Sequence, residues 1–215
     1  MIDAHSATLT YDLQQALLVL RQGGVVAFPT ETYYGLAVDP FNGHAVDHLF
    51  ELKRRPAVKP VLVLIDGLDQ LARLTVGVPE QFSSLMGAFW PGPLTLIFSA
   101  LPSLCTQLTA GTGTIGLRIS SHPFARQLCL LAGGAITATS ANRSGSQPAR
   151  TEQEVVAQFG HEVDWVVKGG PTRGGLASTI IAAKPGGGLC LVREGVIPFA
   201  EACSCLAMKS SAIDE

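Results

Sequence analysis

Short apolar runs alternate with helix-like segments along the 215-residue chain, and this alternation limits the possible fold more than any other feature. The runs are rich in Val, Ile and Leu, and several are apolar on both faces, so we interpret them as buried strands. The predicted strands are residues 25–28, 61–65, 94–98, 115–119, 135–139, 164–167, 178–181 and 189–192. A sheet without a polar face is covered by helices, so the chain is predicted to have an α/β fold.

The segments between these runs carry helix signals. Thr10 can cap a first helix that carries an apolar stripe on one face and ends at a Gly-Gly pair. A second helix is predicted over residues 42–54, with Pro56 ending it. Further helices are predicted near residues 69–74, 79–89, 123–131 and 151–159, and Thr151 with Glu154 opens the last of them as a capping box.

The length suits one well-covered core, so we expect one domain over residues 1–209, with its core at about residues 10–200, and a short polar tail over residues 210–215. No apolar run reaches the roughly 18 residues that a membrane span needs, so no membrane partner is expected. The first residues lack the layout of a secretory signal. The five cysteines are an odd number without a C-x-x-C pair, which favours free thiols in a reducing cytoplasm.

Positive charge is concentrated in one short stretch, LKRRPAVKP at residues 52–60. It holds Lys53, Arg54, Arg55 and Lys59, whereas the formal net charge of the whole chain is −2. This near-neutral balance of charge argues against non-specific electrostatic binding of nucleic acid. From the residues alone, two interpretations of the stretch stay open: a solvated helix end, and a binding site for an anionic substrate.

Two polar loops each follow a predicted strand, which is where ligands bind in α/β sheets. Residues 28–40, FPTETYYGLAVDP, are crowded with hydroxyls and include Glu31, a set that suits a small polar substrate. Residues 137–145, TATSANRSG, present Ser140 and Asn142, whose hydroxyl and amide suit phosphate oxygens. An ordinary polar loop and an Asx or Ser turn remain the alternatives.

Two familiar patterns occur without the context that they require, and a third is absent. GTGTIG at residues 111–116 precedes a strand-like run, whereas a dinucleotide fingerprint opens a helix. No Walker motif is present, so a nucleotide would be held in another way. His44 and His48 share a predicted helix face without an evident third ligand, so we expect a solvated face rather than a metal site.

Seven motifs occur in the order found in the YrdC-like family: VAFPTETYYGLAVDP, LFELKRRP, FWPGPLTLIF, TIGLRIS followed by HP, TSANRSG, GLASTII and LVREG. They run from about residue 13 to residue 197, and the chain resembles the short, single-domain threonylcarbamoyl-AMP synthases (TsaC) of that family. The resemblance implies a single-domain YrdC-like fold, with a twisted, open, mixed sheet and flanking helices around a basic concave cavity.

The resemblance also implies the site residues. The family signature K-x-R with S-x-N gives the implied catalytic residues, Lys53, Arg55, Ser140 and Asn142. ATP is expected at Arg55, Lys59, Thr114, Ser140 and Arg193. Threonine is expected at Thr32, Arg118, the backbone near Ala138, and Ser178. Replacing Lys53 or Arg55 with alanine is expected to abolish adenylate formation while the protein stays folded.

The function implied by the resemblance is a nucleotidyl transfer. L-threonine, bicarbonate and ATP would give L-threonylcarbamoyl-adenylate and pyrophosphate, and a separate transferase complex would place the threonylcarbamoyl group on tRNA. The threonine amine would add to bicarbonate or carbon dioxide, and the carbamate would attack the α-phosphorus, so positioning and electrostatic stabilisation are the main demands. Mg²⁺ is expected to arrive with ATP, without a dedicated protein metal site.

Two other functions stay open at this point. An RNA-binding module of the same fold would use a basic cavity to hold RNA, although the chain has no RNP or KH motif and no aromatic residues among its cations. A relative that transfers carbamoyl groups is the second alternative, although such chains carry zinc-finger and acylphosphatase modules that do not occur in this sequence.

Overall fold

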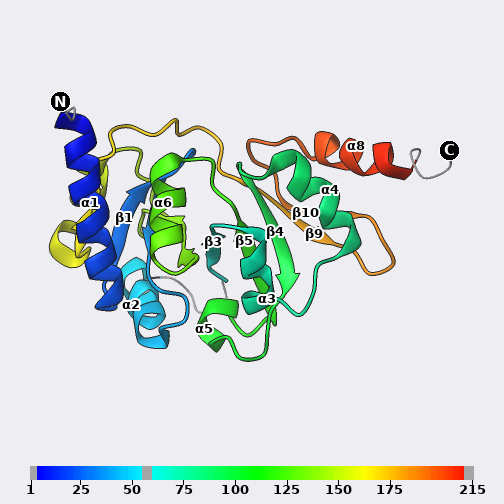
Figure 1. Ribbon diagram of the computed structural model, residues 1–215, viewed down its shortest axis with the longest axis horizontal. Coiled ribbons are helices and arrows are strands. Elements are labelled where there is room, and N and C mark those ends of the chain that lie inside the picture. The colour runs from blue at the N-terminus through cyan, green and yellow to red at the C-terminus, as the bar shows by residue number, and fades with distance from the viewer. Residues whose placement is uncertain (1–3, 55–59, 211–215) are drawn as a thin grey trace.

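The computed structural model describes residues 4–54 and 60–210, and it confirms the α/β fold (Figure 1). The strands form two mixed sheets, whereas one sheet was expected. The smaller sheet has the strand order β7-β2-β1-β8. Its strands are β1 (Val26–Pro29), β2 (Tyr34–Ala37), β7 (Thr139–Ser140) and β8 (Trp165–Val166). Strand β2 lies within the stretch for which only a polar loop was predicted.

The larger sheet has six strands in the order β10-β9-β4-β5-β3-β6. They are β3 (Leu62–Ile65), β4 (Leu94–Ser99), β5 (Thr114–Arg118), β6 (Ala135–Thr137), β9 (Thr179–Ala183) and β10 (Leu189–Arg193). The pairs β3–β5 and β4–β9 are parallel, and the other neighbours are antiparallel. The turn at residues 184–188 joins β9 to β10 as a hairpin, which agrees with the break predicted there.

The two sheets meet where one predicted strand divides. Residues 135–139 were expected as a single strand, but β6 pairs with β3 in the larger sheet and β7 pairs with β2 in the smaller one. At the crossing, the Thr137 amide donates to the Val38 carbonyl (3.0 Å), and the Val38 amide donates to Thr137 Oγ1 (2.9 Å). The Ala138 amide donates to the Leu62 carbonyl (2.8 Å). The segment that follows β6 therefore lies between the sheets.

Helices cover the sheets on both sides. Helices α1 (Ala4–Arg21) and α6 (Pro123–Leu131) pack together and against β1, and α6 also packs on β3 (Figure 1). Their apolar side chains form one core cluster with Phe28, Leu64 and Ile136. The larger core cluster includes buried residues of α2 (Gly43–Lys53), α4 (Glu80–Phe89) and α7 (Glu152–Phe159). The remaining helical elements are η1 (Leu68–Gln70), α3 (Leu71–Leu74), α5 (Thr106–Thr109), η2 (Gly160–Glu162) and α8 (Phe199–Ser210).

The helix ends agree with the sequence signals in part. Thr151 caps α7, because its side chain accepts a hydrogen bond from the Glu154 amide (3.2 Å). Helix α2 ends at Lys53, followed by Arg54 at a φ of 50°; the predicted stop at Pro56 lies outside the described residues. Thr10 is not a cap, since α1 begins at Ala4 and runs through it.

Helix α8 packs against α4 and ends at Ser210, and residues 211–215 lie outside the described part of the chain. The boundary between the domain and the tail remains a prediction. Within residues 4–54 and 60–210, no helix is long and apolar enough to span a bilayer.

Phe82 is a direct test of the larger core. Its side chain is fully buried and packs edge-on against Phe98, with the ring centroids 5.0 Å apart. Phe82→Ala is expected to lower the free energy of unfolding by about 3–5 kcal/mol, because it removes buried contacts and leaves a cavity. Urea denaturation measures this change. The control Val76→Ala alters a side chain that is 66% exposed and is expected to change the value by less than about 0.5 kcal/mol. Equal effects of the two substitutions would contradict the described core.

Candidate functional site

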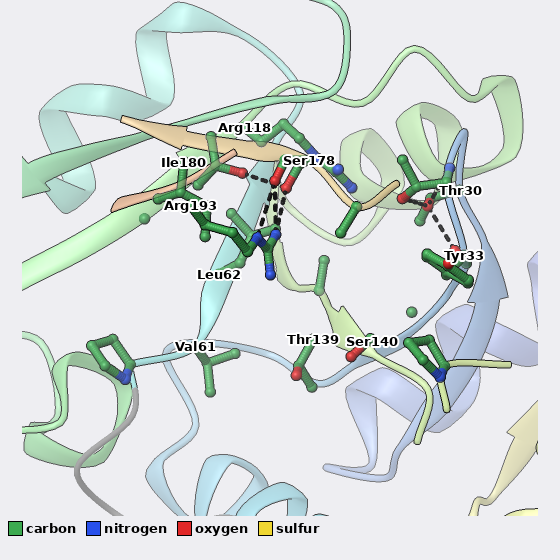
Figure 2. Close-up of a pocket in the computed structure, with 18 of the residues that line it drawn as sticks. Thr30, Tyr33, Val61, Leu62, Arg118, Thr139, Ser140, Ser178, Ile180 and Arg193 are labelled. Atoms are coloured by element: carbon green, nitrogen blue, oxygen red, sulfur yellow. Dashed lines mark hydrogen bonds between the residues drawn. The ribbon is translucent and has the colours of Figure 1, made fainter. Parts of the chain in front are cut away.

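A cavity of about 250 Å³ lies where the two sheets meet (Figure 2). The loop after β1 supplies Thr30 and Tyr33 on one side, and the ends of β9 and β10 supply Ser178 and Arg193 on the other. The crossing segment after β6 and the strand β5 supply further walls. The cavity is lined by Thr30, Thr32, Tyr33, Tyr34, Gly35, Pro60, Val61, Leu62, Thr95, Ile97, Gly116, Arg118, Ala138, Thr139, Ser140, Pro148, Ala177, Ser178, Ile180 and Arg193.

The cavity brings together residues that are far apart in the sequence, from Thr30 to Arg193. All of the residues expected to hold threonine line it: Thr32, Arg118, Ala138 and Ser178. Two of the residues expected at ATP, Ser140 and Arg193, line it as well. Their assigned roles remain predictions, but the sequence motifs that suggested them converge on one hollow.

Arg118 carries a buried charge at the end of β5. The residue is 3% exposed, and the neighbouring Leu117 is fully buried. Its Nη1 lies 3.4 Å from Glu31 Oε1, which is an ion-pair distance, while its Nε is buried without a hydrogen-bond acceptor in the described chain. Burial lowers the pKa of Arg118, and the negative charge of Glu31 partly opposes this shift. An arginine stays protonated under such conditions, so its unused donors favour binding of an anion.

Arg193 holds the opposite wall of the cavity in place. Its Nη2 donates to the Ser178 carbonyl (2.8 Å) and to Ser178 Oγ (3.2 Å), and its Nε donates to the same carbonyl (3.2 Å). Ser178 Oγ also hydrogen-bonds to Thr95 Oγ1 (3.0 Å). Partial burial, followed by the positive charge of Arg118, lowers the pKa of Arg193. The two cations are thus close enough to repel each other, which makes a bound anion favourable between them.

Gly195 allows this wall to form. A Cβ at this position would lie 2.1 Å from the Ala177 carbonyl oxygen and 2.6 Å from the Ser178 carbonyl carbon, distances that no side chain tolerates. Its amide donates to Thr179 Oγ1 (3.0 Å), so the chain after β10 lies directly against the start of β9. Only glycine permits this approach, which explains the last residue of the motif LVREG.

Lys53 braces the loop that follows β7. It is 2% exposed, and its ammonium donates to the Ser140 carbonyl and to the Asn142 carbonyl (2.7 Å). The Lys53 carbonyl in turn accepts from the Ser144 amide (3.0 Å). Lys53 is not among the residues that line the cavity, and these contacts join the end of α2 to the loop. Its expected catalytic role remains a prediction.

Asn142 belongs to the same brace. Its Oδ1 accepts from Ser140 Oγ (2.6 Å), and its Nδ2 donates to the Arg143 carbonyl (3.0 Å) and the Ser146 carbonyl (2.7 Å). The turn alternative therefore describes Asn142 well, whereas Ser140 both joins the turn and borders the cavity. Lys53 and Asn142 of the pattern K-x-R with S-x-N lie together, as expected, and both contact the loop after β7. Their expected catalytic roles remain predictions.

Of the remaining residues expected at ATP, Thr114 is described and does not line the cavity. Thr114 lies at the start of β5, where its hydroxyl hydrogen-bonds to Thr112 Oγ1 (2.8 Å). Because side chains alternate along a strand, it shares a sheet face with Gly116 and Arg118, which do line the cavity. Arg55 and Lys59 lie outside the described residues.

The structure gives two tyrosines of the hydroxyl-rich stretch at residues 28–40 contacts that the sequence did not predict. Tyr34 is fully buried, and its hydroxyl donates to the Gly170 carbonyl (3.0 Å) and accepts from the Gly169 amide (3.2 Å). Tyr33 donates to the Gly175 carbonyl (2.5 Å), so two tyrosines tie the loop after β1 to the segment before β9. Burial raises the pKa of Tyr34, which keeps its hydroxyl protonated as a donor. Thr95 also lines the cavity, although the sequence did not single it out. It is the one polar residue in the apolar run LTLIF, and this is the feature by which the sequence could have identified it.

Metal binding finds no support in the residues around the cavity. No group of three or more His, Cys, Asp or Glu in the described chain is placed to hold a metal ion. The cavity wall offers hydroxyls and guanidinium groups but no carboxylate among the described residues, so it does not fit a protein-held Mg²⁺. Gly111 and Gly113 lie in the turn between α5 and β5, and Gly116 lies within β5, so a strand stands where a dinucleotide fingerprint requires a helix.

Comparisons with known proteins agree with the geometry. Residues 18–195 match the family model Sua5_yciO_yrdC, described as telomere recombination. The chain is 38% identical over 169 residues to a threonylcarbamoyl-AMP synthase of Halorhodospira halophila, covering 79% of this chain and 88% of the relative. It is 42% identical over 188 residues to the threonylcarbamoyl-AMP synthase of Bacillus subtilis, covering 84% of this chain and 53% of the relative.

A solved structure shares the fold. The crystal structure of P. abyssi Sua5 complexed with L-threonine matches with a TM-score of 0.86 and 34% identity. The match covers 91% of this chain and 57% of the P. abyssi chain. The chain therefore spans about half the length of the B. subtilis and P. abyssi proteins, and most of the length of the H. halophila relative.

The position of Lys53 predicts a loss of stability on substitution. Lys53→Met is expected to lower the free energy of unfolding by about 1–3 kcal/mol, because it leaves the Ser140 and Asn142 carbonyls without this donor. Chemical denaturation measures the change, and Lys184→Met at an exposed turn is the matched control. Equal stability of the two variants would contradict this role of Lys53 in the loop. The expectation that Lys53→Ala abolishes adenylate formation while the protein stays folded remains a separate prediction.

His122 predicts a pH dependence of stability. Burial lowers its pKa from the ordinary value of 6.5, and the charge of Glu31 opposes the shift. The unfolded chain then binds more protons than the folded chain, so this contribution to stability is present above pH 6.5 and is lost as the pH falls below it. His122→Gln is expected to reduce the loss of unfolding free energy between about pH 7.5 and about pH 5.5. Denaturation at both pH values, with the exposed His161→Gln as control, measures this; an unchanged pH dependence in His122→Gln would contradict it.

Proposed function

The chain belongs to the Sua5_yciO_yrdC family, and we propose that its cavity is where L-threonine, bicarbonate and ATP are joined into threonylcarbamoyl-AMP with release of pyrophosphate. Relatives at 35–42% identity carry the name threonylcarbamoyl-AMP synthase, which supports this proposal. This activity is a nucleotidyl transfer that serves tRNA modification. The RNA-binding alternative is not favoured by the comparisons.

The single observation that carries the proposal is the buried guanidinium of Arg118 with unused donors beside the cavity. A carboxylate is the natural partner for such a group, because two parallel charge-assisted hydrogen bonds match its planar fork. The α-carboxylate of an amino acid meets this requirement. Arg193 lies close enough to add to the positive potential, as the effect of Arg118 on its pKa indicates.

The remaining walls suit the rest of a threonine molecule. Thr32 and Ser178 offer hydroxyls, and Ala138 offers backbone groups at the crossing between the sheets. Leu62, Ile97 and Ile180 supply apolar surface for a methyl group. A volume of about 250 Å³ is below the roughly 300–1,000 Å³ of pockets for drug-sized ligands, so we place the amino acid inside and the nucleotide at the opening.

The triphosphate is proposed to lie along Ser140, Arg193 and the face of β5 that ends at Thr114, together with Arg55 and Lys59 from outside the described residues. Arginine and lysine stabilise phosphate oxygens in different ways, the first through a planar fork and the second as a point charge. Mg²⁺ would enter with ATP, held by phosphate oxygens and water, since the described cavity wall provides no carboxylate.

The proposed reaction needs placement more than it needs a reactive side chain. The threonine amine adds to carbon dioxide with loss of a proton, or to bicarbonate with loss of water. An oxygen of the resulting carbamate then attacks the α-phosphorus as pyrophosphate leaves. Negative charge collects on the phosphoryl oxygens, where fixed guanidinium groups stabilise it. Holding the carbamate near the phosphorus removes most of the entropy barrier. No protein nucleophile takes part.

The proposal includes where the product goes. Threonylcarbamoyl-AMP would pass to a separate transferase complex that modifies tRNA. We place the reaction in the cytoplasm, because the five cysteines are free thiols and suit a reducing compartment. Direct contact between this chain and RNA is not needed for the reaction.

Threonine-dependent release of pyrophosphate tests the function. The protein is expected to release pyrophosphate from ATP and bicarbonate when threonine is present, and other amino acids are assayed in parallel. Arg118→Met and Ser178→Ala are expected to raise the KM for threonine about tenfold or more, because each removes a hydrogen-bonding group, while the KM for ATP changes less than about threefold. Release that does not depend on any amino acid would contradict the proposal.

A further inference from the structure

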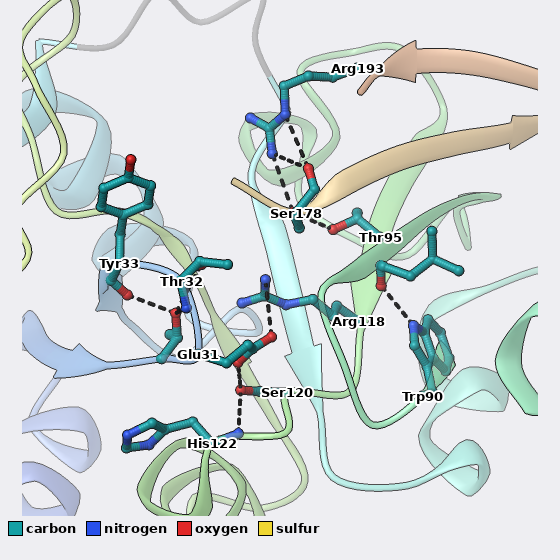
Figure 3. A network of polar contacts seen from close by, with 12 residues as sticks. Glu31, Thr32, Tyr33, Trp90, Thr95, Arg118, Ser120, His122, Ser178 and Arg193 are labelled. Atoms are coloured by element: carbon teal, nitrogen blue, oxygen red, sulfur yellow. Dashed lines mark hydrogen bonds and ion pairs between the residues drawn. The ribbon is translucent and has the colours of Figure 1, made fainter. Parts of the chain in front are cut away.

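Arg118 faces one carboxylate in the described chain, that of Glu31 in the loop after β1 (Figure 3). The two side chains are 4% and 12% exposed, and Arg118 Nη1 lies 3.4 Å from Glu31 Oε1. This distance gives attraction between the charges without a well-formed hydrogen bond. The guanidinium is thus held by its charge while its donors remain available.

Ser120 fixes the other oxygen of the carboxylate. Its hydroxyl donates to Glu31 Oε2 and accepts from the His122 amide (3.2 Å), at the residue that precedes α6. Ser120 is 2% exposed, so water does not compete for these contacts. Because Ser120 follows Arg118 by two residues, one short segment carries both the guanidinium and the hydroxyl that holds its counter-charge.

Glu31 does not reach the cavity that is proposed to bind threonine. It is absent from the residues that line that cavity and lines a separate hollow of about 580 Å³ instead. Its Oε1 is buried and accepts no hydrogen bond from the described residues. A substrate in the first cavity therefore meets Arg118, and Glu31 stands behind it.

We propose that Glu31 is a positioning residue for the amino-acid substrate: with Ser120, it fixes the guanidinium of Arg118 so that its free donors face the cavity. This inference rests on the proposed function. Without the carboxylate, two nearby cations, Arg118 and Arg193, would repel each other with no negative charge beside them, and the guanidinium would turn away from the orientation that a substrate carboxylate needs. Glu31 acts only through Arg118 and makes no contact with the substrate.

A double-mutant cycle on threonine binding tests this role. Isothermal titration with L-threonine is carried out on the unaltered protein, Glu31→Gln, Arg118→Met and the double variant. Glu31→Gln is expected to raise the Kd for threonine about tenfold, because the guanidinium loses its fixed orientation. The same substitution in the Arg118→Met background is expected to change the Kd less than about twofold, since the group that it positions is gone. Equal changes in the two backgrounds would overturn the inference.

Controls separate positioning from a general loss of structure. Glu80→Gln removes an exposed acid on α4 and is expected to leave threonine binding unchanged. Glu31→Gln is expected to leave the Kd for ATP within about twofold, whereas a merely structural role would weaken both ligands. If Glu31→Gln does not fold, Ser120→Ala decides the matter: it keeps the charge, loses the hydroxyl that fixes it, and is expected to raise the threonine Kd about threefold. Unchanged binding by a folded Ser120→Ala would then overturn the inference.

Failure of this inference can be told from failure of the proposed function. If the unaltered protein binds no threonine, the proposed function falls and the inference falls with it. If the unaltered protein binds threonine and Glu31→Gln binds it equally well, the function stands and the positioning role of Glu31 is wrong.

Discussion

The buried charge of Arg118 is the constraint on which the arrangement of the site depends. Transfer of a lone charge into an apolar interior is very unfavourable, so its surroundings must supply negative charge or hydrogen-bond acceptors. Glu31 supplies charge from one side, held there by Ser120. On its other side, Arg118 borders a cavity that is lined by hydroxyl groups. A substrate carboxylate bound there would supply the remaining negative charge and hydrogen-bond acceptors. The buried charge of Arg118 therefore accounts both for its pairing with Glu31 in the folded state and for the proposed binding of a carboxylate ligand.

The cavity exists because the two sheets share one crossing segment. A single straight strand over residues 135–139 would have kept Ala138 and Ser140 within one sheet. Its division into β6 and β7 leaves Ala138 between the sheets and puts Ser140 in the smaller sheet, and both residues line the cavity together with Arg118. Gly195 then allows Arg193 to close the far wall against Ser178. Much of the wall comes from strand ends and the loops beside them, and Ile97 and Gly116 line the cavity from within β4 and β5.

Much of this could be predicted from the sequence, because the apolar runs are distinct and the seven motifs are specific. Thr32, Arg118, Ala138 and Ser178 were expected at one site and line one cavity. The orientation of Lys53 could not be predicted, since a cation at a helix end looks the same whether it faces solvent, a phosphate or, as here, two carbonyl groups. The pairing of Glu31 with Arg118 joins residues 87 positions apart and depends on tertiary structure alone. The roles of Arg55 and Lys59 remain predictions.

A crystal structure of the protein with L-threonine bound tests the central claim most directly. The account predicts the α-carboxylate of threonine within hydrogen-bonding distance, about 3 Å, of the Arg118 guanidinium, in the cavity bordered by Thr32, Ala138 and Ser178. Glu31 should still face Arg118 from behind. Threonine bound elsewhere, with Arg118 making no contact to it, would contradict the account.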